Sequence, residues 1–257
     1  MQRYSYTLSF LLICFSSLSL AASPDKILII VSNQLDMGDQ EKHDARNNLW
    51  EVAPPYHVFL MHGYDVDFMS PNGGKVEFSM DPVGISYYAI KYENFLQKAT
   101  QSLHPDAVKS SQYVAAYIGG GYGTLFDVAS DQKSLELIAQ IYQQGGLVGA
   151  TGHGPGAFAN VKLSSGEYMV KDKKVAGFPN STEITKSWAN QGKLLPFMVE
   201  SQLAKNGAIT INKSNIENKT DVIVDQRLVT TMFLPSAAAV AKEMVDLLAK
   251  ASVDSKK

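Results

Sequence analysis

Short apolar runs recur along this chain, separated by segments with a helical pattern. They are KILIIVSN (residues 26–33), YVAAYIGGG (113–121), LVGAT (147–151) and VIVDQRLVTTMF (222–233). Continuous apolar runs of this length are typical of strands that helices cover on both faces, as in parallel sheets. The pattern therefore predicts an α/β fold whose functional groups lie at the carboxyl ends of the strands.

The segments between the runs supply the helices. Residues 130–146 have a polar start, an apolar face at helical spacing and a closing Gly-Gly pair, and residues 235–251 form a second such segment. Residues 48–64 are also helix-like but contain Pro54 and Pro55. Because proline removes a helical hydrogen bond, we expect that helix to begin or restart at the prolines.

Weaker signals complete the prediction. Alternation predicts a strand in YDVDFMSP (64–71), and a helix is expected around residues 88–100. EYMVKDKKVAGF (167–178) suggests a hairpin, and residues 194–208 a helix. Together the elements predict one α/β domain with a doubly wound, mainly parallel sheet.

The first 22 residues have the organisation of a secretory signal peptide. Arg3 is basic, Leu8 to Leu20 form an apolar stretch, and small residues follow at Ala21 and Ala22. We therefore expect residues 1–22 to be removed. The mature chain is then expected to be exported, either periplasmic or secreted, and to have no membrane attachment.

Composition excludes several classes of function. Cys14 is the only cysteine, so the mature chain has no thiol nucleophile and no disulfide. A net charge of -2 offers no basic surface for nucleic acid. No HExxH or CxxC spacing accompanies the histidines, so we expect no metal and no cofactor. A metal site built from His43, His57, His62 or His153 with Glu51 is therefore not expected.

Two glycine-rich turns follow predicted strands. YIGGGYGTLFD (117–127) fits neither GxGxxG nor a P-loop, so it predicts no nucleotide site. LVGATGHGPGAF (147–158) reads as strand, sharp turn and helix, the arrangement of a nucleophile elbow. An elbow presents one side chain above the sheet beside N–H groups that form an oxyanion hole. At its apex stands Gly152, which has no side chain.

These two turns, with GYDVDFMSPNGGKV (63–76), resemble the DJ-1/PfpI superfamily, which has the class I glutamine amidotransferase-like, flavodoxin-like fold. The resemblance is strongest to its stress-protein branch of glyoxalase III, deglycase and holding-chaperone proteins. It runs from about Lys26 to Ala249, so residues 23–257 are expected to be one DJ-1/PfpI-like domain. The resemblance also implies a homodimer.

The resemblance implies roles for individual residues. The family's nucleophilic cysteine falls on Gly152 and its histidine neighbour on His153. The acidic partner of the thiol falls on Glu51, and the acid that orients the histidine on Glu183. Ligand-binding and oxyanion groups are then expected at Gly120, Gly121, Gly152, His153 and Tyr122, with Tyr122 standing where the family pattern has a histidine.

Two functional hypotheses follow. Gly152, Tyr122 and the altered segment TTMFLPS (230–236) favour a non-catalytic, pseudoenzyme-like module that binds a small carbonyl or carboxylate ligand or protects against stress. The alternative is a glyoxalase III, deglycase or hydrolase-type enzyme that acts on small carbonyl substrates. It would work through water with His153, Glu51 and Glu183 as acid–base groups. The sequence favours the first hypothesis, because it lacks the nucleophile.

Overall fold

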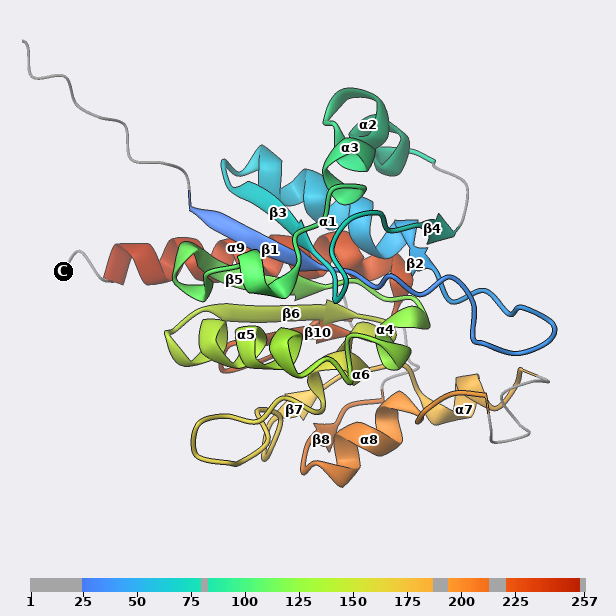
Figure 1. Ribbon diagram of the computed structural model, residues 1–257. Coiled ribbons are helices and arrows are strands. Elements are labelled where there is room, and N and C mark those ends of the chain that lie inside the picture. Colours follow the sequence, from blue (N-terminus) through green and yellow to red (C-terminus); the bar gives the residue numbers. More distant parts are fainter. Residues whose placement is uncertain (1–24, 80–82, 187–193, 213–220, 255–257) are drawn as a thin grey trace, which may run out of the picture.

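A six-stranded sheet forms the centre of the protein in the computed structural model, which describes residues 25–79, 83–186, 194–212 and 221–254 (Figure 1). The strand order is β3-β1-β5-β6-β10-β9, and all neighbours are parallel except the antiparallel pair β9–β10. The fold class predicted from the sequence is confirmed. The predicted signal peptide, residues 1–22, lies outside the described residues. The strands are β1 (Lys26–Ile30), β3 (Asp65–Met69), β5 (Tyr113–Ile118), β6 (Leu147–Thr151), β9 (Ile223–Asp225) and β10 (Leu228–Thr231).

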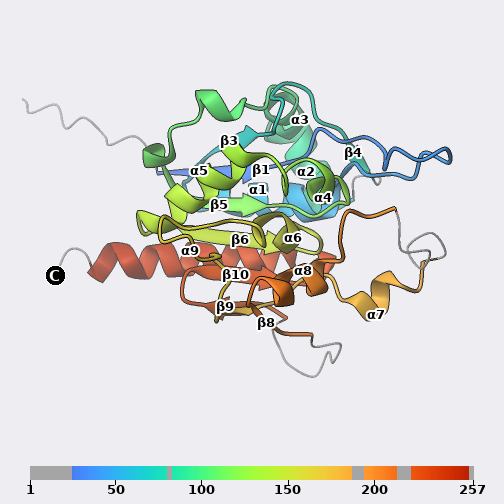
Figure 2. The same cartoon turned by 60° about the horizontal axis from the view of Figure 1, so that its bottom comes forward.

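Helices cover both faces of this sheet (Figures 1 and 2). On one face, α1 (Leu49–Met61) and α9 (Ala237–Asp254) pack over Ile27 and Ile29 of β1. On the other, α5 (Gln132–Gln143) packs over a core that includes Leu28 and Ile30 of the same strand. Successive strand residues therefore alternate between two buried cores, which explains the continuous apolar runs.

Short elements surround the sheet. The segment predicted as a helix around residues 88–100 is two helices, separated where Asn94 adopts a left-handed φ of 56°. Among the described residues, no helix is long and apolar enough to cross a membrane. The remaining elements are α2 (Ile85–Tyr92), α3 (Phe95–Ala99), α4 (Gly123–Phe126), α6 (Gly154–Phe158), α7 (Asn180–Glu183), α8 (Val199–Lys205), β2 (Asn47–Asn48), β4 (Phe78–Ser79), β7 (Lys174–Val175), β8 (Ile209–Thr210) and the 3₁₀ turns η1 (Pro105–Ala107), η2 (Ser110–Gln112) and η3 (Leu234–Ser236).

Helix α1 does not begin at its prolines, contrary to the prediction. It starts at Leu49, where the Asn48 side chain accepts a hydrogen bond from the Trp50 N–H, and both prolines lie inside it. Pro55 has no N–H for the carbonyl of Glu51, one turn earlier. That carbonyl instead accepts a 2.7 Å hydrogen bond from the Tyr117 hydroxyl of β5. A tertiary bond thus replaces a helical one.

The predicted hairpin over residues 167–178 is also wrong. Strand β7 pairs in parallel with β8, more than 30 residues later in the chain. The turn signal is real, because Asp172 has a φ of 59°. However, its N–H donates to the carbonyl of Gly207, so the turn leads to a distant segment and not to a neighbouring strand.

Candidate active site

The first glycine-rich turn, residues 119–123, lies against the loop that leads into α1. Gly123 N–H donates to the Ala45 carbonyl (2.7 Å), and Asn48 N–H donates to the Gly120 carbonyl (3.1 Å). Gly121 has a φ of +120°, and a Cβ on it would lie 2.6 Å from the Arg46 carbonyl oxygen. Glycine at these positions allows the backbone of the turn to pack closely against the backbone of the loop before α1. This packing places the start of α1 at the carboxyl ends of the strands.

Gly152 forms the apex of the turn between β6 and α6. Its φ of +54° lies in the left-handed region, where a residue with a Cβ is strained. Its N–H donates to the Thr231 carbonyl (3.0 Å), and its carbonyl accepts from the Phe178 N–H (2.9 Å). The chain therefore adopts the elbow geometry predicted from the sequence, although the apex has no side chain.

The carboxyl of Glu51 fills the space beside this apex. A Cβ on Gly152 would lie 2.5 Å from Glu51 Oε2, and a Cβ on Gly120 would overlap the same carboxyl group. Glu51 is 1% exposed, and within the described structure its Oε2 has no hydrogen-bond partner. Burial raises the pKa of Glu51 to about 7, and hydrogen bonds from the Thr151 side chain and the Gly120 backbone limit that rise.

Thr151 belongs to the Glu51 environment, which the sequence did not predict. Strand alternation predicts that its side chain points away from the elbow residue. Its hydroxyl instead lies 3.0 Å from the Tyr117 hydroxyl and hydrogen-bonds to the Glu51 carboxyl. The alternation ends here because strand β6 stops at Thr151 and Gly152 has a positive φ. Positions 151 and 152 therefore both face Glu51.

His153 is held by the second predicted acid. Its Nε2 lies 2.8 Å from Glu183 Oε2, and the Tyr122 hydroxyl donates to Glu183 Oε1 at 2.8 Å. The His153 ring stacks on Phe178 (centroids 4.3 Å apart) and contacts Tyr122 (4.2 Å). The tyrosine at the family's histidine position therefore fixes Glu183, which in turn orients His153.

The charges of this pair follow from burial and hydrogen bonding. Burial lowers the pKa of His153 more than Glu183 raises it. Burial alone would raise the pKa of Glu183, but hydrogen bonds from His153 and Tyr122 bring it below its ordinary value. Near neutral pH the pair is thus a neutral imidazole and a carboxylate. Nε2 then carries the hydrogen, and Nδ1 is the basic nitrogen.

A cavity of about 240 Å³ opens above these groups. Of the predicted site residues, Glu51, Gly121, Tyr122 and His153 line it, whereas Gly120, Gly152 and Glu183 lie behind them. The complete lining consists of Asp44, Arg46, Asn48, Glu51, Ser79, Gly121, Tyr122, His153, Phe178, Lys186 and Leu234.

Two of the expected oxyanion donors are already engaged. The N–H of Gly152 bonds the Thr231 carbonyl, and the backbone of Gly120 bonds the Glu51 carboxyl. Of the backbone groups that the resemblance implies, this leaves the N–H groups of Gly121 and His153 as the expected oxyanion donors.

The other histidines lie apart from Glu51. His57 Nδ1 is 2.6 Å from Glu93 Oε1, and His62 Nδ1 is 2.7 Å from the Val58 carbonyl. His43 contacts Asp39 and Glu41 in the loop before α1, and these three are close enough together to hold a metal ion. This cluster is not the one weighed from the sequence, because it does not include Glu51.

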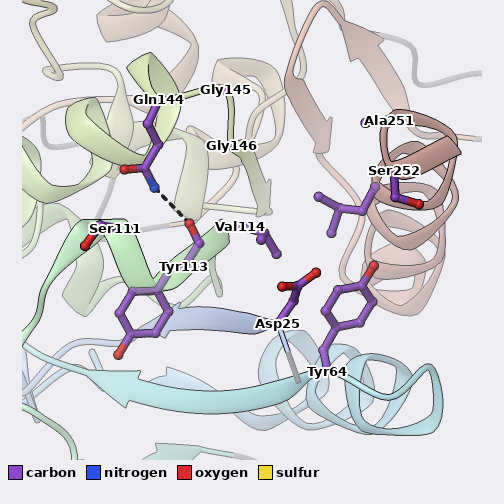
Figure 3. Close-up of a pocket in the computed structure, with 11 residues that line it drawn as sticks. Asp25, Tyr64, Ser111, Tyr113, Val114, Gln144, Gly145, Gly146, Ala251 and Ser252 are labelled. Atoms are coloured by element: carbon purple, nitrogen blue, oxygen red, sulfur yellow. Dashed lines mark hydrogen bonds between the residues drawn. The ribbon is translucent and has the colours of Figure 1, made fainter. Parts of the chain in front are cut away.

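A larger cavity, about 520 Å³, lies at the opposite ends of the strands (Figure 3). Asp25 and Tyr64 face it, together with the end of α9 at Ala251 and Ser252. The Gln144 side-chain amide donates a hydrogen bond to the Tyr113 carbonyl (2.9 Å), so this group has a structural role. None of the predicted site residues reaches this cavity. We therefore place the candidate site at the smaller one.

The DJ-1/PfpI family model matches residues 45–247, which contain the turns, Glu51 and Glu183. The chain belongs to the DJ-1/PfpI family. Glyoxalase 3 of Candida albicans is 26% identical over 211 residues, covering 76% of this chain and 86% of that protein. A glutathione-independent glyoxalase of Saccharomyces cerevisiae is 24% identical over 172 residues, covering 63% and 71%.

Two solved structures show the same fold. The Rapid Encystment Protein of Francisella tularensis matches with a TM-score of 0.76 and 25% identity, covering 86% of this chain and 98% of that one. Glyoxalase III of Candida albicans matches with a TM-score of 0.76 and 23% identity, covering 86% and 96%.

Several site residues were missed by the sequence reasoning. Phe178, which stacks on His153, lies in the same short segment as Glu183. Lys186 follows Glu183 by three residues, a spacing that puts two side chains on one side of a turn. Both were detectable from their proximity to Glu183. Thr151 was not among the predicted site residues, because its contact with Glu51 depends on tertiary packing.

Proposed function

We propose that this protein is a glyoxalase-type enzyme that converts a small 2-oxoaldehyde into a 2-hydroxy acid, with water and a buried carboxyl group in place of a thiol. The observation that carries the proposal is the Glu51 carboxyl, whose pKa is raised to about 7 beside the elbow. A group with this pKa exchanges protons readily near neutral pH. The glyoxalase names of the relatives support this reading over a pure binding module.

The proposed reaction begins with hydration. Water adds to the aldehyde carbon C1 of the substrate and forms a gem-diol. Ionised Glu51 then removes the hydrogen from C1, which is acidic because C2 is a carbonyl. The electron pair moves toward the C2 oxygen and gives an enediolate. Protonated Glu51 returns the proton to C2. One C1 hydroxyl gives its proton to the C2 oxygen, so C1 becomes the carboxyl carbon and C2 carries the hydroxyl group.

His153 has the complementary task in this scheme. As a neutral imidazole on Glu183, it has a basic nitrogen that accepts a proton from the attacking water and returns it to the former aldehyde oxygen, which completes the gem-diol. The enediolate oxygen is placed near the N–H groups of Gly121 and His153. Each role is assigned to residues that line the same cavity.

A binding module is the second candidate, and Gly152 favours it. With no atom for nucleophilic attack at the position matching the family cysteine, the cavity retains the capacity to hold a small carbonyl or carboxylate compound without transforming it. Turnover separates the two candidates.

The test is lactate formation from methylglyoxal by the mature protein. We expect native turnover and at least a hundredfold loss of kcat in Glu51→Gln. Glu93→Gln is the matched control, because Glu93 also has a buried oxygen without a partner in the described structure but does not line the cavity. Equal activity in native and Glu51→Gln, or no lactate from the native protein, contradicts the proposal.

We propose further that the enzyme acts after export, on the basis of the signal-like residues 1–22. Expression of the full chain followed by cell fractionation tests this. A shortened product in the periplasm or medium is expected, and a full-length product in the cytoplasm contradicts it.

A further inference from the structure

Lys186 enters the cavity from the segment after α7. Its Nζ lies 4.6 Å from the centre of the Tyr122 ring and 5.3 Å from that of Phe178. It also donates to the Tyr122 hydroxyl and lies 3.9 Å from Glu183 Oε1. The two rings that hold His153 therefore also hold an ammonium group beside it.

The proposed reaction creates a negative charge on the substrate, which the N–H groups of Gly121 and His153 can bond but cannot neutralise. When Glu51 takes the proton from C1, the carboxyl becomes neutral and negative charge appears on the C2 oxygen. Among the described lining residues, Arg46 and Lys186 are cationic. Arg46 already donates to Asp44 through Nε and Nη2, both at 2.9 Å. Lys186 is also paired, with the Tyr122 hydroxyl, but its Nζ lies over the two rings that contact His153 and so is placed beside the proposed acid–base groups.

We infer that the Lys186 ammonium group donates a hydrogen bond to the C2 oxygen of the substrate and stabilises the enediolate, an inference that rests on the proposed function. Lys186 is then a catalytic residue. Lys186 would favour 2-oxoaldehydes, because their negative charge develops on the oxygen of C2, the carbon next to the aldehyde carbon.

Its surroundings suit this role. Burial lowers the pKa of Lys186 and the Glu183 carboxylate partly restores it, so the ammonium is incompletely solvated. A donor that has already lost part of its water interacts more strongly with a new charge than a hydrated one does. Contacts with two rings also hold the side chain in place before the reaction.

Lys186→Met and Lys186→Arg test the inference, with Lys91→Met as the matched control. Lys91 also lies over two rings, Tyr87 and Tyr92, but does not line the cavity. The probe is acetohydroxamate, whose planar anion resembles the enediolate of methylglyoxal. Calorimetry measures its binding, and melting curves check folding.

We expect Lys186→Met to weaken acetohydroxamate binding at least tenfold and to lower kcat for methylglyoxal about a hundredfold, with KM changed less than threefold. Lys186→Arg should retain part of both, and Lys91→Met should match the native protein. Native turnover combined with unchanged acetohydroxamate binding in Lys186→Met overturns the role of Lys186 and leaves the proposed function standing. Absence of native turnover overturns the proposed function itself.

Discussion

The Glu51 carboxyl occupies the space into which a side chain on Gly152 would extend. A Cβ on Gly152 would lie 2.5 Å from Glu51 Oε2, closer than two such atoms can approach. The resemblance puts the family's nucleophile at this position. Because Gly152 has no side chain, the Glu51 carboxyl has room to lie beside the elbow.

Gly152→Ala should therefore displace Glu51. We expect a loss of about 2–3 kcal/mol in the free energy of unfolding, partly from the positive φ and partly from the contact, and at least a tenfold loss of kcat. Chemical denaturation and lactate assays measure the two effects.

The control for this change is Gly74→Ala. Gly74 has a φ of +69°, and a Cβ on it would have nothing within 4 Å, so it reproduces the backbone strain without the clash. If Gly74→Ala and Gly152→Ala lose equal stability and both keep full activity, Glu51 is not crowded by position 152.

Glu51 should also set how stability depends on pH. Its pKa rises from 4.5 to about 7 on folding, so the folded protein binds this proton more tightly than the unfolded chain does. The contribution of Glu51 to stability therefore falls as pH rises from about 4.5 to about 7 and stays low above that. Glu51→Gln should be more stable than the native protein at pH 8, by about 3 kcal/mol at most.

Denaturant titrations of both proteins at pH 5 and pH 8 measure this difference. At pH 5, just above the ordinary pKa of 4.5, the difference in the free energy of unfolding should shrink to about 1 kcal/mol. A difference that is the same at both pH values would mean that the Glu51 carboxyl is not protonated by folding.

Glu183 should control the tautomer of His153. Glu183→Gln replaces a carboxylate acceptor with an amide that also donates, so the preference for hydrogen at Nε2 weakens. We expect kcat to fall about tenfold or more. Nitrogen NMR of the His153 ring should show protonation at Nε2 in the native protein and a mixture in the variant. Unchanged ring signals in an equally folded variant would show that Glu183 does not orient His153.

The sheet was predicted from local hydrophobic patterns, whereas the site residues were predicted from a resemblance to a known family. The β1, β5 and β6 strands and helices α5 and α9 were predictable because burial on both faces, or on one helical face, leaves a local pattern. Glu51, His153 and Glu183 came from the resemblance, and the structure brings them to one place.

The remaining features depend on distant partners. The tolerance of α1 for Pro55 rests on the Tyr117 hydroxyl from β5, and the pairing of β7 rests on β8. Neither partner is visible in the local sequence. Lys186 is a mixed case: it lies near Glu183 and Phe178 in the sequence, but its contact with the Tyr122 ring depends on tertiary packing.

The measurement that tests the account most directly is the conversion of methylglyoxal in D₂O, with lactate examined by proton NMR. If a carboxyl group carries the hydrogen from C1 to C2, part of the lactate should contain deuterium at C2, because the Glu51 proton exchanges with solvent between removal and return. Glu51→Gln should form almost no lactate. Lactate formed at the native rate with only hydrogen at C2 would indicate direct hydride transfer and contradict proton transfer through Glu51.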